Sequence, residues 1–132
     1  MKNKTLVAAV VGLGLSLLAS SGTAHHSFAA QFAADKPFKM IGTVTKVEWR
    51  NPHAWFFIDV KDDNDEVTNW GMELSSPNLL MRQGWARSSM KVGDAVTVEG
   101  FHSRDGTPTG NARSVMLNAS GKTLTIKSSG TP

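Results

Sequence analysis

The chain contains no cysteine in its 132 residues. Disulfide bonds, thiolate metal sites and cysteine nucleophiles are therefore excluded, and stability must come from an ordinary hydrophobic core. The sequence also lacks a glycine-rich phosphate-binding motif and a metalloprotease signature. Four of its eleven acidic residues, Asp62, Asp63, Asp65 and Glu66, crowd a single predicted turn, where a solvated loop is expected rather than a pair of catalytic carboxylates. Because the sequence shows no recognisable set of catalytic residues, it favours a non-enzymatic role.

No apolar run reaches the roughly 20 residues that a membrane-spanning helix needs. The longest, residues 6–19, follows Lys2 and Lys4 and precedes a run of small residues that ends at Ala24. A basic segment, an apolar segment and a small-residue cleavage site in this order are typical of a signal peptide. We therefore expect residues 1–24 to be removed on export, which predicts a periplasmic or secreted protein. The alternative, an uncleaved membrane anchor, finds no stop-transfer charges after the apolar run.

Basic residues form no cluster. Without Lys2 and Lys4, twelve basic and eleven acidic residues remain, so the formal charge of the mature chain is +1 rather than +3. Nucleic-acid binding requires a clustered excess of basic residues, and a nucleic-acid partner is therefore not expected. The remaining chain is long enough for one domain. We expect an N-terminal arm over residues 25–38 with room for one helical turn, a domain over residues 39–127 and a disordered tail over residues 128–132.

Hydrophobic patterning after the arm predicts strands and one short helix. The β-branched residues of 40–49 predict a strand, whose alternation slips between Val44 and Val47 as it would at a bulge. Ser75-Ser76 as a cap, with Pro77 at the first helical position, predicts a short helix that ends at Gly84. Further strands are expected over 54–60, 66–74, 95–101 and 112–117, with a last short strand within 121–126.

This order of elements predicts a mainly β fold. Three strands, a helix and two further strands are the order of an OB-fold, in which the helix lies between strands three and four. We therefore predict a five- to six-stranded OB-fold-like Greek-key barrel. The alternative is another small antiparallel barrel or sandwich with an incidental helix.

Histidines supply the first candidate site. Cleavage after Ala24 would make His25 the first residue, so that its α-amine and imidazole could chelate one ion in the arrangement called a histidine brace. Nitrogen ligands of this kind suit Cu(II) or Zn(II). His53 falls in the loop between the first two predicted strands and His102 where the fourth strand ends, and these two loops flank the usual OB-fold binding face. The sequence therefore predicts a copper or zinc site formed by His25, His26, His53 and His102.

Aromatic residues supply the second candidate site. Trp55 and Phe57 share one face of the second predicted strand, and exposed aromatic residues on OB-fold strands can stack on sugars or bases. With Asn51 and Trp70 they form a candidate ligand-binding surface. In most small barrels such residues belong to the core, so a structural role is the competing interpretation for each tryptophan.

Several motifs together resemble a known family. They are His25-His26-Ser27-Phe28-Ala29, Gly42-Thr43-Val44 through Trp49, Asn51-Pro52-His53-Ala54-Trp55, Trp70, Ser76-Pro77-Asn78, Gly84-Trp85 and Lys91-Val92-Gly93-Asp94. In these motifs the chain resembles a family of small exported proteins of Gram-negative bacteria, catalogued as a domain of unknown function. It is similar, more distantly, to periplasmic bacterial OB-fold proteins that bind ligands or cations. The resemblance implies export but no activity, and His102 lies outside the motifs that carry it.

The leading functional prediction is a non-enzymatic, periplasmic or secreted module that binds a transition metal. The alternative is a barrel that binds a small organic ligand or a protein through its aromatic residues. In that case the histidines are incidental, with His53 capping a turn and His102 at a solvated strand end. A third alternative, an oxidative copper enzyme, depends on the N-terminal brace alone.

Overall fold

The computed structural model describes residues 28–127. The predicted signal peptide, His25, His26 and the predicted tail over residues 128–132 lie outside the described residues. The chain divides into two compact units, Met1–Ala30 and Gln31–Pro132, and the second contains the strands that follow. A helical turn covers residues 28–31. It lies within the predicted arm over residues 25–38, which was expected to have room for one helical turn.

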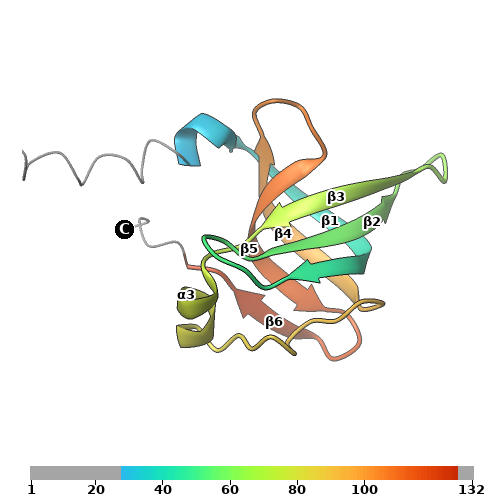
Figure 1. Ribbon diagram of the computed structural model, residues 1–132. Coiled ribbons are helices and arrows are strands. Elements are labelled where there is room, and N and C mark those ends of the chain that lie inside the picture. Colours follow the sequence, from blue (N-terminus) through green and yellow to red (C-terminus); the bar gives the residue numbers. More distant parts are fainter. Residues whose placement is uncertain (1–27, 128–132) are drawn as a thin grey trace, which may run out of the picture. The chain divides into compact units, whose positions relative to one another are not determined.

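Six strands and one short helix make up the second unit, within the described residues (Figure 1). The mainly β class is therefore confirmed. In chain order the elements are β1 (Phe32–Glu48), β2 (Trp55–Lys61), β3 (Val67–Glu73), α3 (Pro77–Arg82), β4 (Ala95–Ser103), β5 (Thr109–Leu117) and β6 (Lys122–Thr125).

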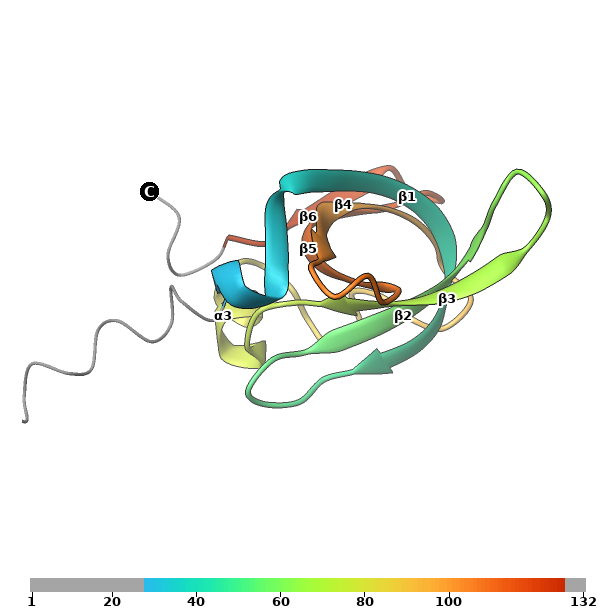
Figure 2. The ribbon, with the colours of Figure 1, turned by 90° about the horizontal axis from the view of Figure 1, so that it is seen from above.

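The sheet closes into a ring. Antiparallel pairing runs in the order β3-β2-β1-β4-β5-β6, and β3 also pairs with β5 in parallel, through Gly71↔Thr109, Met72↔Gly110 and Glu73↔Asn111. Figure 2 looks down on this ring, from which the β2–β3 hairpin extends outward. β6 continues the sheet along the later part of β5, beyond the residues that pair with β3.

Strand β1 is longer than the sequence predicts. It begins at Phe32, so residues 32–38 belong to the sheet and the expected arm over residues 25–38 is shorter than predicted. The pairing of β1 with β4 is irregular between Phe32 and Pro37. A proline has no N–H to donate to a ladder, but a register irregularity accommodates it, which is why Pro37 does not end the strand.

The predicted bulge in β1 is confirmed. Val44 pairs with Ile58 and Lys46 with Phe57, so Thr45 is the extra residue. Val44 is also close to the point where β1 changes partners, because its earlier residues pair with β4 and its later residues with β2. The bulge increases the local twist of the strand there, which allows one strand to serve both neighbours.

The core fills the inside of the ring. Its fully buried side chains include Phe56, Ile58, Met72, Leu80, Val44, Val96, Val98 and Val115. Val96 and Val98 are fully buried, and Thr97 between them is only 7% exposed. Its hydroxyl donates a 2.9 Å hydrogen bond to Asn118 Oδ1, so burial leaves the polar group with a partner.

Helix α3 begins and ends where the sequence predicts. The Ser76 hydroxyl accepts a hydrogen bond from the Leu79 amide, and Pro77 occupies the first turn, where its missing N–H costs nothing. Leu80 is fully buried, and Gly84 has a φ of +90°, a conformation that a side chain would strain. No helix among residues 28–127 is long and apolar enough to cross a membrane.

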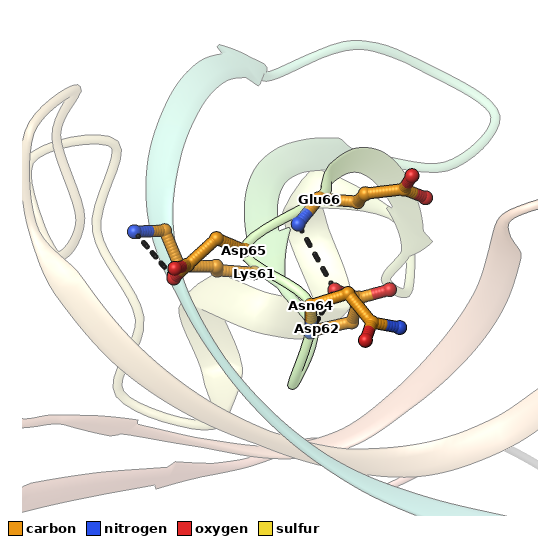
Figure 3. Close-up of polar contacts among 5 residues, drawn as sticks. All are labelled: Lys61, Asp62, Asn64, Asp65 and Glu66. Atoms are coloured by element: carbon orange, nitrogen blue, oxygen red, sulfur yellow. Dashed lines mark hydrogen bonds and ion pairs between the residues drawn. The ribbon is translucent and has the colours of Figure 1, made fainter.

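The acidic residues between β2 and β3 form a turn, as the sequence analysis expected. Asp62 Oδ1 accepts hydrogen bonds from the Asn64 and Glu66 amides at 2.8 and 2.9 Å, and Lys61 pairs with Asp65 at 3.2 Å (Figure 3). The Asp62 carboxylate therefore organises the backbone of the hairpin.

Gly110 provides a test of how tightly the ring is packed. A Cβ at this position would lie 2.5 Å from Phe38 Cε1 and 3.2 Å from the Phe101 carbonyl oxygen. We expect Gly110→Ala to lower the free energy of unfolding in urea by about 1–3 kcal/mol, because the core cannot accept the added methyl group. A Phe38→Leu background should recover part of this loss. An equal loss in both backgrounds would contradict the predicted clash.

Candidate functional site

The candidate site is centred on an ion pair between a loop and the end of a strand. His53 lies in the loop between β1 and β2, and Glu73 is the last residue of β3. His53 Nδ1 is 2.7 Å from Glu73 Oε1. The side chain of His53 is 50% exposed, whereas that of Glu73 is 10% exposed. A half-exposed imidazole is thus held by a carboxylate that is itself almost enclosed.

Strand pairing places the two residues together. Glu73 pairs with Trp55 in β2, and the adjoining Ala54 exchanges backbone hydrogen bonds with Leu74 and Ser75. The ladder therefore continues past the end of β3 as far as the residue next to His53. On its other side Glu73 pairs with Asn111 of β5, so it lies where the ring closes.

The electrostatics of the pair are set by burial. Burial raises the pKa of Glu73 above its usual value of 4.5, because desolvation penalises the carboxylate. The positive charge and the hydrogen bond of His53 act in the opposite direction and lower this pKa. With Nδ1 of His53 bonded to the carboxylate, Nε2 is the ring nitrogen left to meet a ligand.

Trp55 and Phe57 lie beside this pair on the outer face of the sheet. Their neighbours Ala54, Phe56 and Ile58 are fully buried, and strand alternation turns the two rings outward, where both are partly exposed. A Cβ on Gly71 would come within 3.2 Å of the Phe57 ring and 3.7 Å of Trp55. The glycine therefore lets both rings lie over the β3 backbone. We call Trp55, Phe57 and Gly71 the aromatic face.

Charged residues of β1 border the aromatic face. Lys46 Nζ lies 5.4 Å from the centroid of the Phe57 ring, within the range of a cation–π contact. Glu48 forms ion pairs with Lys46 at 2.5 Å and with Arg50 at 2.9 Å. The hydrogen bond from Lys46 lowers the pKa of Glu48, so this carboxylate remains ionised and balances the two cations.

Trp70 and His102 lie elsewhere. Trp70 pairs with the buried Ile58, so it is on the inner side of the sheet and does not join the aromatic face. His102 packs edge-on against Phe38 and Trp70, with ring centroids 5.1 and 5.5 Å away. Trp85, 3% exposed, belongs to the core. The core interpretation therefore applies to Trp85 and in part to Trp70, but not to Trp55.

Only some of the predicted metal ligands lie within the described residues. Asn51 and His53 are exposed in the same loop, but His25 and His26 lie outside the described residues. Across residues 28–127, no group of three or more His, Asp or Glu side chains is arranged to hold a metal ion.

Sequence reasoning missed Glu73. The register of the predicted hairpin could have shown that Glu73 lies near His53. The turn at residues 62–66 pairs Lys61 with Val67, and counting away from the turn along both strands pairs Trp55 with Glu73. That count places the carboxylate two residues from His53 across the ladder. Strand alternation between Met72 and Leu74 would have turned Glu73 away from the core, so the enclosure of its carboxylate could not be read from the sequence.

The Glu73 pKa predicts a pH-dependent stability. Because its pKa is raised, the Glu73 carboxyl group holds its proton more tightly in the folded protein than in the unfolded chain. Its contribution to stability is therefore complete below pH 4.5 and is lost as the pH rises through the folded-state pKa. Glu73→Gln removes this titration. In urea unfolding, the stability of Glu73→Gln relative to the parent should therefore be higher at about pH 7 than at about pH 4.

A His53→Ala background supplies the control for this measurement. Because His53 lowers the pKa of Glu73, its removal should widen the difference between the two pH values. A relative stability that is the same at both pH values, in both backgrounds, would mean that Glu73 does not titrate differently in the folded state.

Comparison with known proteins gives a family but no activity. Residues 14–113 match the model of DUF6152, described as a family of unknown function. No curated protein matches the chain. The match spans well over half of the sequence and includes His53, Trp55 and Glu73. The chain therefore belongs to the DUF6152 family of unknown function.

Proposed function

We propose that the mature protein is a periplasmic or secreted, non-enzymatic module that binds Cu(II) or Zn(II) through His53 and the N-terminal residues His25 and His26. The cut after Ala24 would supply the α-amine of His25 as a further nitrogen ligand. Nitrogen donors of this kind match the preferences of both ions. Export, cleavage and metal binding are the three parts of this proposal.

The observation that carries the proposal is the 2.7 Å contact between His53 Nδ1 and Glu73. Histidines that bind metals almost always donate their other ring N–H to a carboxylate or a carbonyl, which fixes the tautomer and raises the basicity of the ligating nitrogen. Glu73 meets this description, and the side chain of His53 is 50% exposed. A turn-capping role would not need a buried carboxylate behind the ring.

His102 takes no part in the proposed ligand set. Its ring packs against Phe38 and Trp70 rather than against another ionisable group. We propose that the domain is an OB-fold, which the strand order, the parallel β3–β5 pairing and the helix between β3 and β4 support. In that fold the loop carrying His53 borders the usual binding face.

Titration of Cu(II) and Zn(II) into protein with its native processed terminus tests this proposal. We expect His53→Ala and a form with one added residue before His25 each to weaken binding, because each removes a nitrogen ligand. Glu73→Gln should weaken binding about tenfold, as is usual when the outer partner of a ligating histidine is changed. Calorimetry or competition with a chelator measures the affinities.

His102→Gln is the matched control, since it removes an imidazole that we place outside the ligand set. The proposal is wrong if no metal binds at about micromolar concentration. It is equally wrong if the extended terminus and His53→Ala both bind as tightly as the parent.

The aromatic face supports a second candidate function, the binding of a small planar or sugar-like ligand. Trp55 and Phe57 are partly exposed side by side, and the lack of a side chain on Gly71 lets both rings lie over the β3 backbone. Rings presented in this way can stack on a ligand, and Lys46 at the border can neutralise an acidic substituent. This candidate makes the histidines incidental.

Tryptophan fluorescence against a panel of glycans and metabolites tests the second candidate. Trp55→Ala should abolish binding of any ligand found, whereas Trp70→Phe should retain it, because Trp70 lies on the inner side of the sheet. Equal binding by Trp55→Ala and the parent would remove the aromatic face from consideration.

A further inference from the structure

A surface groove of about 470 Å³ lies where the C-terminal end of α3 meets β6. Figure 1 shows the helix and the strand beside each other, far from the β2–β3 hairpin. Arg82, Gln83 and Gly84 line the groove from the helix, and Lys122 to Thr125 and Lys127 line it from the strand. None of these residues belongs to the site proposed above.

Hydrogen bonds fix the two walls of the groove relative to each other. The side-chain amide of Gln83 donates to the Lys127 carbonyl at 2.8 Å and accepts from the Lys127 amide at 3.0 Å. The indole N–H of Trp85 donates to the Thr125 carbonyl at 3.3 Å. The groove is therefore held together by the fold itself, because three hydrogen bonds join the two segments that form its walls, which are 40 or 44 residues apart in the sequence.

The charge of the groove has a single sign. Arg82, Lys122 and Lys127 line it, and no acidic residue does. Among residues 28–127, these three cations take part in none of the ion pairs, which engage other basic residues. In a domain whose acidic and basic residues are nearly balanced, three cations that line one groove, with no acidic residue in its described lining, concentrate positive potential at one place.

The edge of β6 adds uncharged donors. The Ile126 amide donates to the Arg113 carbonyl, so Ile126 and, by alternation, Leu124 direct their backbone groups at β5. The Thr123 amide therefore faces away from β5, on the same side as the Thr125 carbonyl that Trp85 binds. Thr123 and Thr125 are also among the residues that line the groove.

We propose that this groove binds a phosphate-like oxyanion, either free or carried by a small molecule or a lipid headgroup. An arginine presents a planar fork that matches two oxyanion oxygens, and the two lysines add point charges. The Thr123 amide and the threonine hydroxyls complete the donor set, and no carboxylate opposes the ligand. The volume of the groove is within the range of small-molecule sites.

Amide NMR with three probes tests the proposal: inorganic phosphate, glycerol phosphate, and phosphatidylglycerol vesicles compared with phosphatidylcholine vesicles. We expect saturable shifts of the Gly84 and Thr123 amides and of the Trp85 indole N–H. A response to the soluble probes supports a free or small-molecule phosphate, and a response only to the anionic vesicles supports a headgroup. Lys122→Gln/Lys127→Gln should weaken the response about tenfold, since two charge-assisted contacts are lost.

The matched control is Lys61→Gln/Lys91→Gln, which lowers the net charge equally at sites outside the groove. It should leave the affinity within about twofold of the parent, apart from the general effect of net charge. The proposal is overturned if no probe shifts the three signals, or if the control loses as much affinity as the groove variant. Gln83 is left unchanged in both variants, so the walls stay joined.

Discussion

The parallel pairing of β3 with β5 is the contact on which the rest of this fold depends. Only three residue pairs form it, yet they turn a meandering sheet into a closed ring. Closure covers edges of β3 and β5 that would otherwise present unpaired backbone groups to other chains. Gly110 is one of the paired residues, and a side chain there would collide with the Phe38 ring of β1. The core residues inside the ring depend on the same three pairs.

The candidate metal ligand is tied to this closure. Glu73 forms the last of the three pairs, and its enclosure between β2 and β5 is what makes its carboxylate costly to ionise. His53 relieves part of that cost and is oriented in return. A ligand that drew His53 away from Glu73 would leave a buried charge behind, so ligand binding and the integrity of the ring are energetically coupled.

Much of the fold could be predicted from local sequence. The bulge near Val44 appeared as a slip in alternation, and the start of α3 appeared as a serine cap before Pro77, because bulges and caps are set by a few neighbouring residues. The start of β1 could not be read in this way. The predicted arm extended to residue 38, and only the irregular pairing with β4, a long-range contact, shows that the strand already passes through Pro37.

The site was predictable to a smaller extent, for the same reason. His53, Trp55 and Phe57 were identified from residue type and strand alternation, and the outward direction of the two aromatic rings followed the predicted period of two. His102 lies in β4 and Trp70 in β3, whereas Phe38, the ring that both of them contact, lies in β1. No local sequence pattern could show this packing, because the three rings come from three different strands. Glu73 gained its importance only from the pairing that encloses it.

The amide pair between Gln83 and the backbone of Lys127 has a consequence for the chemistry at that end of the domain. A carboxamide does not ionise, so neither hydrogen bond depends on the protonation of a side chain. The junction between α3 and the end of β6 is therefore held in the same way at any pH at which the domain is folded.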